Sequence, residues 1–156
     1  MLHLNAREYR KTLSRLREHL AVVDRNASLN QWNDINYNHV PSKANLKYRN
    51  AFLKHDEERR KAYLASLQKG EDSVKINADS MFLYDIVQAY MENNSFWGGS
   101  LKPYDESLEQ LWNAQESPKD YDDILVIRDG SGSMEQKLSG NSSVTALNVA
   151  DSIALY

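Results

Sequence analysis

Apolar residues along most of the chain recur three or four positions apart, which predicts helices rather than strands. The clearest run spans residues 6–24 and consists of Tyr9, Leu13, Leu16, Leu20 and Val23. Asn5, followed three residues later by Glu8, is typical of a capping box at a helix start. We therefore expect an amphipathic helix here, and its apolar side needs a partner.

The same spacing predicts a series of further helices joined by short turns. We expect them at residues 28–35, 43–54, 57–69, 80–93 and 105–116. Ser42 and Asp56 are suited to cap two of these helices, and Gly70 stands where a left-handed residue ends one. Short connections favour antiparallel packing of neighbouring helices.

The pattern changes after residue 116. Residues 117–123 have no apolar period and read as a linker. The apolar run from Ile124 to Arg128 predicts a buried strand, and a last helix begins near Val144, with Ser143 as its cap. The expected fold is mainly α: an antiparallel helical module over residues 1–116, then the first β-loop-α unit of a Rossmann-like α/β domain over residues 124–156.

The loop after the predicted strand carries the most distinctive chemistry. Asp129, Ser131 and Ser133 stand at alternate positions, and the glycines between them allow a tight turn. Loops at this end of a parallel strand are where open α/β sheets bind ligands. A carboxylate and two hydroxyls are hard oxygen donors, which suit Mg²⁺ or Mn²⁺.

The pattern Asp-x-Ser-x-Ser resembles the metal-ion-dependent adhesion site of von Willebrand factor A domains. The resemblance implies that Asp129, Ser131 and Ser133 hold Mg²⁺ (or Mn²⁺) in a non-enzymatic, metal-dependent binding protein. In that family a protein partner can offer a carboxylate to the open position of the metal, so a protein partner is implied as well.

A wider resemblance includes the helical part. The strings at residues 128–134 and 145–150, with those at 40–44, 52–59 and 75–78, are similar to a group of uncharacterised viral and cellular proteins. In that group a module like the TROVE module of Ro-type ribonucleoproteins precedes the A domain. The resemblance implies a helical surface that contacts RNA.

The chain departs from the A-domain pattern at its end. That family completes its metal site with a Thr and an Asp on later loops, but this sequence stops at Tyr156. Thr145 and Asp151 stand too close to the motif to be those ligands. We therefore expect a fragment, with only weak cation affinity.

Charge is divided unevenly between the two parts of the chain. Residues 1–69 hold 14 Lys and Arg against 7 Asp and Glu, whereas residues 70–156 hold 5 against 15. A basic helical part could attract RNA phosphates, or it could simply be solvated. The candidate RNA contacts are Lys43, Lys47, Arg49, Lys54, Arg59 and Arg60. A protein-interaction scaffold without nucleic acid is the competing hypothesis.

Several function classes are disfavoured. The chain has no cysteine, no apolar run long enough for a membrane and no signal-peptide core, so we expect a cytoplasmic protein. An apolar strand ending in Asp129 resembles the start of a phosphatase-like hydrolase. Such an enzyme needs a second Asp where Ser131 stands, so this remains a remote alternative. We expect a protein that is not an enzyme.

Overall fold

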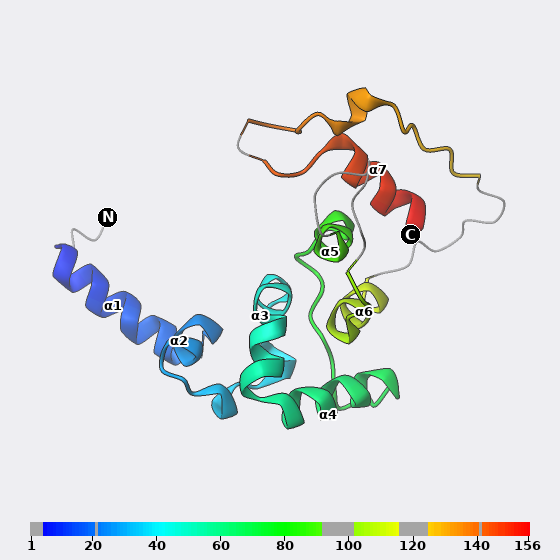
Figure 1. The fold of residues 1–156 in the computed structure, drawn as a ribbon. Helices are drawn as coiled ribbons and strands as arrows, with labels where there is room; N and C mark the ends of the chain where they lie inside the picture. The colour runs from blue at the N-terminus through cyan, green and yellow to red at the C-terminus, as the bar shows by residue number, and fades with distance from the viewer. Residues whose placement is uncertain (1–4, 21, 92–101, 116–124, 141) are drawn as a thin grey trace.

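The chain is mainly helical. The computed structural model describes residues 5–20, 22–91, 102–115, 125–140 and 142–156. Within these ranges the α-helices are α1 (Ala6–His19), α2 (Val23–Ser28), α3 (Ser42–His55), α4 (Glu57–Gln68), α5 (Leu83–Tyr90), α6 (Glu106–Asn113) and α7 (Ala146–Leu155). Short 3-10 turns lie at Trp32–Asp34, Tyr37–His39 and Gly132–Glu135. Figure 1 shows α1 projecting from the body formed by α3 to α7.

Two hydrophobic clusters hold the body together. The first joins α2, the two turns that follow it, α3 and α4, and it includes Trp32, Tyr37, Phe52 and Leu64. The second joins α5 and α6 through Met81, Ile86, Leu108 and Leu111. α7 then packs across α5, far along the sequence (Figure 1). Burial of these side chains is the main driving force for the fold.

Local sequence signals explain several helix boundaries. Asn5 accepts hydrogen bonds from two backbone N–H groups of α1 while Glu8 accepts one from the Asn5 backbone, so the predicted capping box is confirmed. Gly70 has a φ of 71°, the left-handed conformation expected after α4. Asp105 caps α6 by accepting from the N–H groups of Ser107 and Leu108.

Other predicted boundaries differ from the structure. The first helix ends at His19 rather than at residue 24, and Val23 begins the separate helix α2. Ser42 and Asp56 make no capping bonds, because Ser42 is the first residue inside α3 and the carboxylate of Asp56 bonds the Tyr37 hydroxyl instead. The cap of α7 is Thr145 rather than Ser143.

The predicted strand is not formed. Ile124 lies outside the described residues, and residues 125–128 are in no β-ladder; Leu125 and Ile127 are 83% and 86% exposed. A parallel strand requires a neighbouring strand to accept and donate its backbone hydrogen bonds, and no described segment forms a β-ladder with these residues. The described residues therefore do not show the expected Rossmann-like unit, and α7 packs on the helix α5 instead of on a sheet.

Candidate functional site: an exposed oxygen-lined loop

The loop after residue 128 brings the three predicted metal ligands together. The Asp129 carboxylate accepts a hydrogen bond from the backbone N–H of Ser131 at 2.8 Å. The hydroxyl oxygens of Ser131 and Ser133 lie 2.9 Å apart. A 3-10 turn that begins at Gly132 curls the backbone so that these side chains share one side. The sequence motif therefore folds into one exposed cluster of oxygen donors.

Contacts on both sides of the loop fix its position. Before it, the Arg128 guanidinium pairs with the Asp151 carboxylate on α7 at 2.9 Å, and both side chains are largely buried. After it, Lys137 and Thr145 form an antiparallel bridge. Gln88 of α5 donates to the Ser143 carbonyl and to the Asn148 side chain at the start of α7. The loop is thus held on the α5–α7 pair.

The chemistry of the loop fits a hard divalent cation. The hydrogen bond from Ser131, with help from the Arg128 charge, lowers the pKa of Asp129, so its carboxylate is ionised at neutral pH. No group of three His, Asp or Glu side chains suited to a metal occurs among the described residues. A cation here would rest on one charge and two hydroxyls, with water filling its remaining positions, which implies modest affinity.

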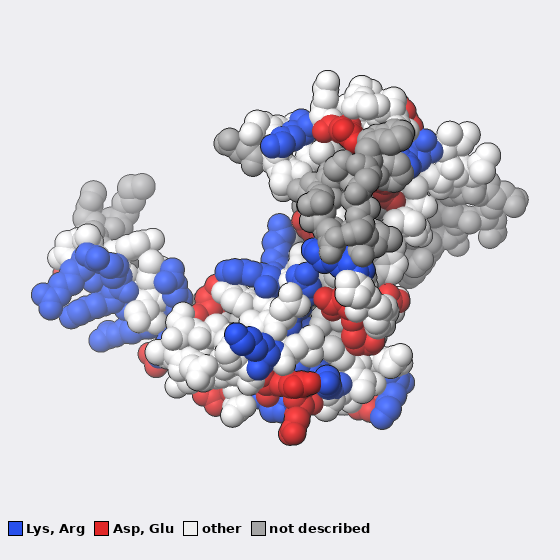
Figure 2. Space-filling view, viewed as in Figure 1, with Lys and Arg blue, Asp and Glu red and all other residues white. Residues whose placement is uncertain are grey.

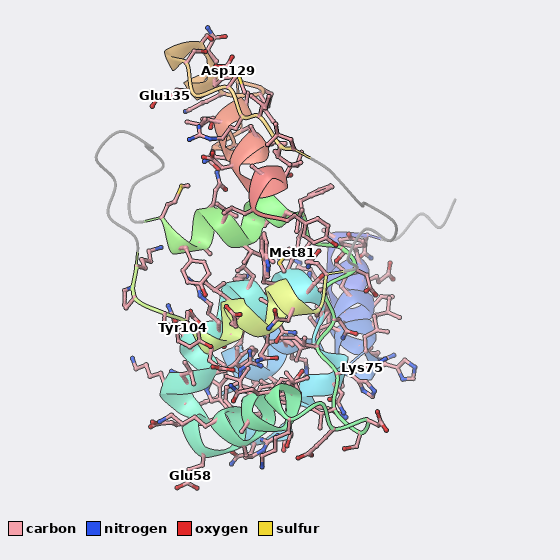
Figure 3. All side chains as sticks on the ribbon, turned by 90° about the vertical axis from the view of Figure 1, so that its right-hand side faces the viewer. Glu58, Lys75, Met81, Tyr104, Asp129 and Glu135 are labelled. Atoms are coloured by element: carbon pink, nitrogen blue, oxygen red, sulfur yellow. The ribbon has the colours of Figure 1, made fainter. Side chains whose placement is uncertain are left out.

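Figure 3 shows where this loop lies in the molecule. Asp129 and Glu135 lie at one end, beyond α7, and Glu58 on α4 lies at the opposite end. Asp129 in the loop and Glu135 just after it are both solvent-exposed, so this end of the molecule is open to solvent. The importance of Asp151 was missed from the sequence. It pairs with Arg128 across 23 positions, and no local pattern signals such a contact.

The predicted RNA contacts do not form one surface. Arg60 must be corrected, because it is fully buried. Its guanidinium donates to the side chains of Asn45 and Ser107, each at 3.2 Å. Its charge lies 5.1–5.3 Å from the ring centres of Tyr37, Phe52 and Tyr63. A phosphate cannot reach it.

Arg49 is mostly buried and Arg59 is exposed, but both arginines are engaged in contacts within the chain. Arg49 pairs with Asp105 at 3.0 Å and is mostly buried. Arg59 pairs with Asp56 at 3.1 Å and donates to the carbonyls of Asn33 and Ile35. These arginines bind the chain to itself, so using them to bind RNA would break contacts that hold the fold.

The three lysines remain accessible. Lys47 pairs with Asp24 and lies over the Tyr48 ring, while Lys43 lies 6.0 Å from the centre of the Phe82 ring. Lys54 is exposed at the end of α3. Tyr48 is half-buried and Phe52 is in the core, so these aromatics are not free to stack on bases. Of the predicted set, Lys43, Lys47 and Lys54 are the exposed residues that RNA could contact without breaking the arginine contacts described above.

Comparison with known proteins places the chain in a family. Residues 2–121 match a family described as a domain of unknown function, DUF2828. An uncharacterised protein of Acanthamoeba polyphaga mimivirus, L728, is 29% identical over 148 residues, which cover 84% of this chain and 24% of that protein. The chain therefore spans about a quarter of that relative.

No solved structure matches the chain. In the ranges that the structure describes, no helix is both long and apolar enough to span a membrane. The family match ends at residue 121, before the oxygen-lined loop at residues 129–133, so the match does not include that loop. Over its helical part, the chain belongs to the DUF2828 family.

Proposed function

We propose that this chain is a non-enzymatic binding protein whose loop at residues 129–133 takes Mg²⁺ or Mn²⁺. One observation carries the proposal: Asp129, Ser131 and Ser133 present an ionised carboxylate and two adjacent hydroxyls on one exposed turn. Hard oxygen donors of this kind match the preferences of both ions. Resemblance to the von Willebrand factor A metal site supports the same assignment.

The role of each residue follows from its chemistry. Asp129 supplies the only formal charge of the motif, so it dominates the attraction. Ser131 and Ser133 supply dipoles and orient the ion. Coordination positions left open by these residues can accept a carboxylate from a partner protein. Ser131 stands where a hydrolase would need a second carboxylate, which supports binding rather than catalysis.

Removing the charge of Asp129 should weaken cation binding more than removing either hydroxyl. We expect Asp129→Asn to lower the affinity for Mn²⁺ by about tenfold or more, and Ser131→Ala and Ser133→Ala to lower it by less. Asparagine can still accept the hydrogen bond from Ser131, so the turn is kept. Water-proton relaxation during a Mn²⁺ titration measures the affinity.

The matched control is Asp72→Asn, which removes the same charge from an exposed residue before α5. It should leave Mn²⁺ affinity unchanged, because Asp72 is not in the loop. Equal weakening by Asp72→Asn and Asp129→Asn would show that Mn²⁺ responds only to overall charge and would contradict the proposed site.

RNA binding by the helical module is a second candidate, supported by the exposed lysines of α3. Neutralising Lys43, Lys47 and Lys54 together should weaken binding to unrelated RNA sequences alike and flatten its salt dependence, because each lysine neutralises a phosphate. Fluorescence anisotropy with two unrelated RNAs across a salt series measures both effects. Undetectable RNA binding by the parent protein at low salt would favour a protein-interaction scaffold.

A further inference from the structure

Helix α1 leaves its apolar side uncovered. No residue of α1 is buried, and Tyr9, Leu16 and the C-cap residue Leu20 are 55%, 50% and 69% exposed. Figure 1 shows the helix projecting from the body, joined to it only through α2. A 14-residue helix gains little stability from backbone propensity alone, so an uncovered amphipathic helix is expected to gain stability when its apolar side is buried against a partner.

The shape of this apolar side favours a helical partner. Tyr9, Leu13, Leu16 and Leu20 are separated by steps of four, three and four, the spacing of the a and d positions of a coiled coil. Only these two positions of each heptad are apolar, which gives a narrow seam. A helix lying on a lipid surface presents a broader apolar side, so the stripe fits a second helix better than a membrane.

Charges beside the seam indicate the nature of that helix. With Leu13 and Leu20 at position a, Arg10 and Arg17 both occupy position e, next to the seam. They line a cleft between α1 and α2, together with Arg25 and the half-exposed Leu29. Asp24 also lines this cleft, but its carboxylate is already held by Lys47 and the Tyr48 hydroxyl. Arg10 bonds only the Ala6 carbonyl of its own helix, and among the described residues Arg17 has no acidic partner. Figure 2 shows the concentration of basic side chains on this helix.

Pairing between two copies of α1 is disfavoured by the same charges. In an antiparallel pair the e positions face each other, so Arg10 of one copy would meet Arg17 of the other. In a parallel pair Arg17 would face Thr12, which offers no negative charge. Three of the four seam residues are leucines, which cannot stack on bases, and Tyr9 alone would offer a single stacking surface, which argues against RNA at the seam. An acidic helix satisfies both the leucines and the arginines.

We propose that α1 is a docking helix that pairs through Tyr9, Leu13, Leu16 and Leu20 with an amphipathic helix of a partner protein, whose acidic side chains pair with Arg10 and Arg17. The partner buries the leucines, and its carboxylates enter the cleft between α1 and α2. Complementary charges at such flanking positions determine which helices pair. This role does not depend on cation binding by the loop at residues 129–133.

A designed peptide tests the pairing directly. The probe is a fluorescein-labelled peptide of three heptads with Leu at a and d and Glu at e and g, and the comparison peptide carries Lys at e and g. We expect the whole protein to bind the Glu peptide at least about tenfold more tightly than the Lys peptide in fluorescence anisotropy. Arg10→Glu with Arg17→Glu should reverse the preference.

Two matched variants separate the seam from general attraction. Arg7→Glu with Arg15→Glu makes the same charge change on the side of α1 away from the seam, so binding of the Glu peptide should stay within about twofold. Leu13→Ala with Leu16→Ala should abolish binding of the Glu peptide while leaving the thermal unfolding of the protein, followed by circular dichroism, unchanged. The proposal would be overturned if the two double arginine variants lost affinity for the Glu peptide equally. It would also be overturned if the parent protein did not bind the Glu peptide, or if anionic phosphatidylserine vesicles displaced that peptide.

Discussion

Replacement of Arg60 by alanine should lower the free energy of unfolding by about 3 kcal/mol or more. The change leaves a cavity between α3, α4 and α6, and it deprives the side-chain oxygen Oδ1 of Asn45 of its buried donor. It also removes a charge stacked among the rings of Tyr37, Phe52 and Tyr63. Urea unfolding followed by circular dichroism measures the loss.

Arg60→Met is the informative comparison. Burial disfavours the charged form of Arg60 and lowers its pKa, and its Nε atom has no hydrogen-bond partner among the residues that the structure describes. Methionine keeps most of the volume and removes the cost of burying a charge. Arg60→Met should therefore lower the free energy of unfolding clearly less than Arg60→Ala does. Unfolding of Arg60→Ala within about 0.5 kcal/mol of the parent protein would mean that the buried contacts contribute little.

Phe52→Ala should lower the free energy of unfolding by about 3–5 kcal/mol. Its side chain has no exposed surface and makes edge contacts with Trp32 and Tyr37, at ring-centre distances of 6.2 and 5.3 Å. Alanine would empty the centre of the first cluster. The same denaturation experiment measures the effect.

Phe82→Ala is the matched control, because it removes an identical side chain that is 59% exposed. We expect it to lower the free energy of unfolding by less than about 1 kcal/mol. Similar losses for both phenylalanines would indicate that Phe52 does not occupy the core.

Most of the helices could be predicted from the sequence because helix periodicity is a local property. The helix predicted at residues 28–35 was wrong, because α2 ends at Ser28 and only the 3-10 turn Trp32–Asp34 follows in that range. Spacing of three and four is present in the chain itself, as are the Asn5–Glu8 box and Gly70. The role of Asp56 could not be predicted in this way. Its carboxylate meets the Tyr37 hydroxyl and Arg59, and the pairing with Tyr37 joins positions 19 apart.

Arg60 shows that a basic residue in the sequence is not always exposed in the folded protein. Its surrounding rings come from a 3-10 turn, α3 and α4, and only the folded chain brings them together. The sequence predicts that Arg49, Arg59 and Arg60 lie on the surface, either as RNA contacts or as solvated side chains. Long-range packing instead makes all three of them structural.

The predicted strand is not formed at residues 125–128, because the long-range partner that it needs is missing from the described residues. An apolar run reports that residues can be buried, but a strand also needs a neighbour that the run does not specify. The loop at residues 129–133 could be predicted because its contacts join residues two apart. Its anchor, the pair of Arg128 with Asp151, depends on the packing of α7 and could not.

The most direct test of the proposed function is a nuclear magnetic resonance experiment on the ¹⁵N-labelled protein, which measures which amide signals Mn²⁺ broadens. Paramagnetic broadening falls steeply with distance from the ion, so it locates the site. We predict that substoichiometric Mn²⁺ broadens the signals of residues 129–135 first, and that Asp129→Asn removes this effect. Earliest broadening at another acidic segment, such as residues 105–109, or broadening that persists in Asp129→Asn, would contradict a cation site in this loop.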